Sequence, residues 1–164
     1  MNLKYLDVYL NDHLAGATLG HELAKRAASS NEGTGYGSFL SELEHEIAED
    51  RASLVRLMER LEIKQDRIKT TGAYLGEKLG RLKPNAQLVG YSPLSRVVEL
   101  EFLMIGVTGK LALWRALLAV AHADERLDAQ ELGMLAERAE SQRVELEQQR
   151  LKAAEDAFLS PVSA

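Results

Sequence analysis

Helical projection places five polar side chains on or near the inward faces of four predicted helices. They are His13, Glu46, Asp50, Glu101 and Gln149. In an antiparallel pair of helices with equal rise, facing residues have numbers that add up to a constant, about 64 for the first pair and about 250 for the second. This pairing brings the five side chains to one level near mid-height, with Glu46 at the rim. One histidine with two or three carboxylates suits Fe, Mn or Zn, so a metal, if bound, is expected here.

The same side chains can instead form a buried polar network. His13 would then pair with Asp50, and Glu101 with Arg150 or Arg143. Such networks are common because an isolated buried charge costs too much free energy to remain unpaired. A full ligand set is missing and arginines are at hand, so we favour the network and expect no cofactor.

Four long helices are predicted to hold these side chains. Apolar residues recur at steps of three and four through most of the chain, and no strand pattern competes. The predicted helices cover residues 3–29, 38–62, 93–122 and 128–159. Ser38 is a candidate cap for the second helix, and Ser92 followed by Pro93 starts the third. The 164 residues are enough for one domain with a core, which we assign to residues 1–164.

The connection between the second and third helices differs from the other two. It has roughly thirty residues and contains a shorter predicted helix at 65–82, about 27 Å long. That length can carry the chain from one end of a bundle to the other and join two hairpins lengthwise. In helix number, length and order the chain resembles the ferritin-like superfamily. The resemblance implies an all-α four-helix bundle of ferritin-like topology, with an additional helix in the long crossover.

Ferritin-like di-iron proteins carry Glu-x-x-His motifs, and residues Glu42 to His45 spell one. At about 100° per residue, however, His45 points away from the apolar arc that contains Leu43 and Ile47. Glu22 on the first helix fails the same test, and residues 128–159 contain no histidine. The complete di-iron motif is therefore missing, and the Glu-x-x-His sequence is expected on the surface.

Basic residues concentrate on the predicted crossover helix. They are Lys64, Arg67, Lys69, Lys78, Arg81 and Lys83. Gly72, Gly76 and Gly80 recur four residues apart on the same helix, a spacing that lets another backbone approach closely. We favour tight packing of this face across the bundle, with the basic side chains in solvent. The alternative is a basic amphipathic surface for a membrane, an acidic partner or a second subunit.

The composition excludes several classes of site. With 20 basic and 25 acidic residues the net charge is −5, which argues against a general nucleic-acid surface. The absence of cysteine excludes disulfides and thiolate chemistry. Charges within the first residues argue against a signal peptide. The most apolar stretch, residues 97–121, holds four charged side chains, which argues against an integral membrane segment. We expect a soluble, cytoplasmic protein.

Function is the least determined property of the sequence. No arrangement of serine, histidine and aspartate indicates nucleophilic catalysis, so we predict a structural or interaction role rather than an enzyme. One alternative is a divergent ferritin-like metal-binding protein or oxidoreductase that uses Fe or Mn. Another is a peripheral module that binds anionic surfaces through the crossover helix. A homo-oligomer is a further expectation, because the third helix is apolar on more than one side.

Overall fold

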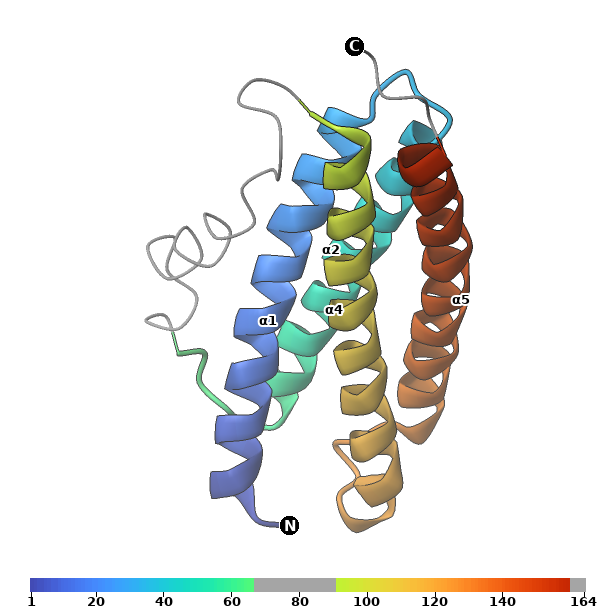
Figure 1. Cartoon of the computed structure of the whole chain (residues 1–164). Coiled ribbons are helices and arrows are strands. Elements are labelled where there is room, and N and C mark those ends of the chain that lie inside the picture. Colours follow the sequence, from blue (N-terminus) through green and yellow to red (C-terminus); the bar gives the residue numbers. More distant parts are fainter. Residues whose placement is uncertain (67–90, 160–164) are drawn as a thin grey trace.

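Four long α-helices lie side by side in the computed structural model, which describes residues 1–66 and 91–159 (Figure 1). The helices are α1 (Leu3–Ser30), α2 (Gly37–Arg60), α4 (Pro93–Val120) and α5 (Ala129–Leu159), and the short 3₁₀ helix η1 (Ala121–Ala123) follows α4. No strand occurs in these described ranges. The predicted all-α, four-helix architecture is confirmed, and the predicted helix ends lie within two residues of the observed ones.

The predicted crossover helix at 65–82 is tested only at its start. Residues 65 and 66 are not helical, and the remainder lies outside the described residues. The glycines and most of the basic side chains predicted for that helix lie there as well.

Polar side chains cap the N-termini of α1 and α4, whereas α2 has no side-chain cap. Asn2 Oδ1 accepts a hydrogen bond from the Tyr5 amide at 3.3 Å. The predicted Ser92 cap is present, since its Oγ accepts from the Ser95 amide at 3.1 Å. The predicted cap at Ser38 is wrong, because α2 already begins at Gly37 and has no side-chain cap.

The four helices do not simply alternate up and down along the chain. α1 neighbours both α2 and α4, and α5 neighbours α4. In Figure 1, α2 and α4 begin at the same end of the bundle and run in the same direction, while α1 and α5 run oppositely. Asp66 lies beside the N-terminal half of α1, where its amide donates to Asn11 Oδ1 at 2.7 Å. Tyr91 lies beside the other end of α1, where its hydroxyl accepts from Asn31 Nδ2 at 2.8 Å.

The apolar core consists of two clusters separated by a polar layer. One cluster contains Leu54, Leu111 and Ala139 together with residues nearer the α4–α5 turn. The other contains Ile47, Val107 and Leu146 together with residues nearer the α1–α2 turn. Between these levels α2, α4 and α5 contribute polar side chains, and Asp50 is the one member of the predicted mid-height cluster that is fully buried there.

Helix α4 has a second apolar face that points away from this core. Phe102 is 43% exposed and Ile105 is 64% exposed. Pro93–Ala123 is long and apolar enough to cross a membrane, with a mean hydropathy of 1.6, although 33% of its most apolar window is buried within the bundle. The four charged side chains of residues 97–121 are spaced widely enough that an 18-residue window of this helix contains no more than two of them. Length and composition are weak grounds for a membrane segment, because core helices of soluble proteins share them.

Candidate functional site

A cavity of about 440 Å³ lies between α1, α2 and α4 near the middle of the bundle. Its wall is chiefly apolar and includes Leu54, Leu103 and Trp114. Three exposed lining residues, Asp12 and Gly16 of α1 and Gly106 of α4, mark where the cavity opens to solvent. A volume of this size lies within the range of small-molecule pockets.

Four helical glycines line this cavity: Gly16 and Gly20 on α1, and Gly106 and Gly109 on α4. A β-carbon placed on any of them would have no described atom within 4 Å apart from the local backbone of its own helix. Packing against the described helices therefore does not require glycine at these positions. Each glycine costs about 1 kcal/mol of helix stability relative to alanine, and its effect here is to leave the cavity open.

Asp50 anchors the polar layer at the inner side of the cavity. Lys110 of α4 donates to its Oδ2, and Arg138 of α5 donates to its Oδ1. Gln142 Nε2 lies 3.4 Å from the same Oδ2 and 2.7 Å from Glu46 Oε2, and Lys110 Nζ donates to Gln142 Oε1 at 2.5 Å. We call these five residues the Asp50 network. Asp50 is 2% exposed, and its carboxylate accepts from three protein donors.

Burial and charge act in opposite directions on the cations of this network. Desolvation is the largest effect on the pKa of Lys110 and lowers it, while the negative charge of Asp50 acts to raise it. Desolvation is also the largest single effect on the pKa of Arg138, but Asp50 and Glu49 together outweigh it and raise that pKa. Glu49 Oε2 accepts from the Arg138 guanidinium at 2.8 Å. Arg138 therefore remains charged and compensates Asp50.

His13 also lines the cavity, but no hydrogen bond joins it to Asp50 within the described ranges. The pairing predicted for the polar network is thus replaced by Lys110 and Arg138, which reach Asp50 from α4 and α5. The His13 ring packs edge-on against Tyr9 with centroids 4.5 Å apart. Burial lowers its pKa, against the opposing charge of Asp12, so the imidazole is neutral near pH 7.

The remaining predicted metal ligands lie elsewhere. Glu101 is half-exposed and forms an ion pair with Arg150 at 3.5 Å. Arg150 was one of the two partners expected for Glu101 in the polar network. Arg143 instead pairs with Glu140 on its own helix at 2.5 Å. Gln149 Oε1 is buried and has no hydrogen-bond partner among the described residues. No group of three or more histidine, aspartate or glutamate side chains in the described ranges is arranged to hold a metal, and the metal site stays a prediction.

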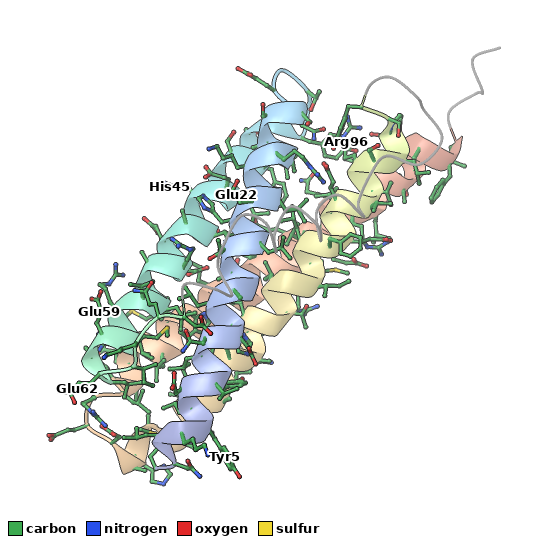
Figure 2. The ribbon with its side chains drawn as sticks, turned by 90° about the vertical axis from the view of Figure 1, so that its left-hand side faces the viewer. Tyr5, Glu22, His45, Glu59, Glu62 and Arg96 are labelled. Atoms are coloured by element: carbon green, nitrogen blue, oxygen red, sulfur yellow. The ribbon has the colours of Figure 1, made fainter. Side chains whose placement is uncertain are left out.

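The sequence predicted two surface features, the Glu-x-x-His sequence at Glu42 to His45 and a basic surface on the crossover helix. His45 is 76% exposed and pairs with Glu49 at 3.4 Å. Figure 2 shows it on the outer side of α2, as expected for the Glu-x-x-His sequence. Of the six basic residues assigned to the crossover surface, only Lys64 lies within the described residues, where its backbone oxygen accepts from Asn11 Nδ2 at 3.1 Å.

Sequence reasoning missed the residues that shape the cavity. Lys110 reaches the Asp50 network from α4, whereas Glu99 of the same helix accepts a hydrogen bond from Arg26 Nε at 3.0 Å. The available signal was the presence of paired glycines inside two strongly predicted helices, Gly16 with Gly20 and Gly106 with Gly109.

Known proteins do not supply a function for this site. No protein-family model matches the chain. No curated protein and no solved structure matches it either. The function has to be inferred from the geometry of the cavity.

Proposed function

We propose that this protein is a binding protein that holds a small, largely apolar molecule in the cavity between α1, α2 and α4. This is an interaction role, with a small molecule as the partner. The cavity combines a chiefly apolar wall with a few polar side chains at one level, which is the usual composition of a ligand pocket.

The observation that carries the proposal is the set of four glycines. A helix surface that merely packed against its neighbours would gain stability from alanine at these positions, and the described residues leave room for it. Together the four glycines give up about 3–4 kcal/mol of helix propensity. A ligand that occupies the open space offers a physical reason to retain them.

The Asp50 network supports binding rather than chemistry at this site. A general acid or base needs a lone pair or proton that is available to the substrate. The carboxylate of Asp50 already accepts from Lys110, Arg138 and Gln142. Its role is therefore to hold three helices at a fixed separation, which keeps the wall of the cavity in place.

The test uses Gly109→Leu, which places a side chain in the cavity without a clash at its β-carbon. The neutral fluorescent probe N-phenyl-1-naphthylamine should bind the wild-type protein saturably, and Trp114, the single tryptophan, should report it by energy transfer or quenching. Gly109→Leu should abolish probe binding while leaving the unfolding midpoint unchanged or raised, because leucine favours helix over glycine.

Gly133→Leu on α5 is the matched control. This glycine also lies in a helix and has no described atom within 4 Å of an added β-carbon, but it does not line the cavity. The Gly133→Leu protein should bind the probe as tightly as the wild type does. Absence of saturable binding to the wild-type protein, or equal binding by Gly109→Leu, would show that the cavity is not a binding site.

A ferritin-like topology is the second part of the proposal. It is supported by α2 and α4 running in the same direction (Figure 1) and by Asp66 and Tyr91 lying beside opposite ends of α1. Two hairpins joined by a lengthwise connection have this arrangement. An experimental structure with a different path between residues 66 and 91 would contradict it.

A further inference from the structure

We infer that the ligand is an amphiphile with an apolar body and one anionic head group of the carboxylate type, held by Arg51. The inference rests on the proposed function, since it assigns the ligand class of the same cavity. It is carried by an excess of hydrogen-bond donors over acceptors around the cavity wall.

Arg51 is a cation of this wall that no carboxylate of the described residues compensates. It lines the cavity from α2, and its side chain is half-buried. Its Nε donates to Thr18 Oγ1 at 3.1 Å, and it has no carboxylate partner within the described part of the chain. A guanidinium has five N–H donors in a fixed fork. The donors that remain suit a carboxylate, which accepts two parallel hydrogen bonds from this group.

Two further donors lie around the same cavity. Lys110 uses two of its three N–H groups, one for Asp50 and one for Gln142. The Nε1–H of Trp114 is buried and has no hydrogen-bond partner among the described residues. A buried donor without a partner costs about 1–3 kcal/mol, so a ligand acceptor would relieve a cost that the free protein carries.

The acceptors around the cavity do not match these donors. Asp50 already accepts from Lys110, Arg138 and Gln142. Asp12 is exposed at the opening and already takes part in an interaction of its own. The neutral imidazole of His13 offers one lone pair. A cationic head group would meet the positive charges of Arg51 and Lys110. The negative charges of Asp12 and Asp50 repel a dianion such as phosphate more strongly than a monoanion. A monoanion fits best.

The experiment compares three ligands with the same apolar chain and different head groups, all below their micellar concentrations. Dodecanoate, dodecanol and dodecylamine compete for N-phenyl-1-naphthylamine bound to the full chain. Dodecanoate should displace the probe at a concentration lower than the other two by about tenfold or more, which corresponds to about 1.4 kcal/mol. Arg51→Gln should remove this advantage and leave displacement by dodecanol unchanged.

Arg56→Gln is the matched control, because it removes the same charge from α2 at a position that does not line this cavity. It should keep the preference for dodecanoate. Arg51→Lys retains the charge without the fork and should show an intermediate preference; it also serves if Arg51→Gln does not fold. Equal displacement by the three ligands, or a preference for the amine, would overturn the inference while probe binding still supports the proposed function. Failure of the probe to bind would remove both.

Discussion

At the scale of single residues, the most informative side chain is the histidine of the cavity wall. Burial lowers the pKa of His13 below its ordinary value of 6.5. Between the two pKa values the unfolded chain binds a proton at this residue and the folded protein does not. Folding stability therefore rises with pH through this window, is fully present above about pH 6.5, and is lost progressively as the pH falls below it.

His13→Phe removes this titration while keeping an aromatic ring next to Tyr9. The free energy of unfolding, measured with urea at several pH values between 5 and 7, should fall less steeply toward low pH in the variant than in the wild type. Equal slopes in the two proteins would mean that the pKa of His13 is the same in the folded protein and in the unfolded chain.

At the scale of elements, the α1–α2 turn depends on one glycine. A β-carbon on Gly37 would lie 2.8 Å from the backbone oxygen of Asn31, which cannot move away as a flexible side chain can. Asn31 itself is fixed, because it is fully buried and its Oδ1 accepts from Arg96 Nε at 2.6 Å. The first turn of α2 and the last turn of α1 are therefore held in contact at this point.

Gly37→Ala should lower the free energy of unfolding by about 1–3 kcal/mol, the usual cost of forcing extra volume into a packed site. Gly35→Ala is the control, since its β-carbon would meet only the Lys152 ammonium at 3.7 Å, and its effect should stay within about 0.5 kcal/mol. Urea unfolding of both variants provides the comparison. Similar midpoints for the two variants would contradict the close contact.

The elements were largely predictable from the sequence, and the site only in part. Apolar periodicity fixes the four helices because burial of one face is what stabilises them. Equal rise along paired helices also predicted that Glu101 faces Arg150. The partner of Asp50 was not predictable in this way, because Lys110 reaches it from a helix outside its hairpin. The cavity was missed because it forms only when three helices pack together. The glycines that line it are its only signal in the sequence.

At the scale of the whole molecule, the Asp50 network joins the two hairpins. Lys110→Met should destabilise the protein by about 3–5 kcal/mol, because it removes one of the two cations that compensate a buried carboxylate. Asp50→Leu should be destabilising as well, since Lys110 then loses its carboxylate. The double variant Asp50→Leu/Lys110→Met should be less destabilised than either single variant, since Arg138 keeps Glu49. A double-mutant cycle from urea unfolding measures the coupling, and additive effects would contradict it.

The shared direction of α2 and α4 also bears on how the chain folds. In a bundle whose helices alternate up and down, neighbours in space are mostly neighbours in sequence. Here the contacts between hairpins join distant residues, such as Asp50 with Lys110, 60 positions apart, and Tyr36 with Asp156, 120 positions apart. Folding slows as the mean sequence separation of contacts increases. We therefore expect each hairpin to form as a local, fast step and the docking of one hairpin on the other to limit the folding rate.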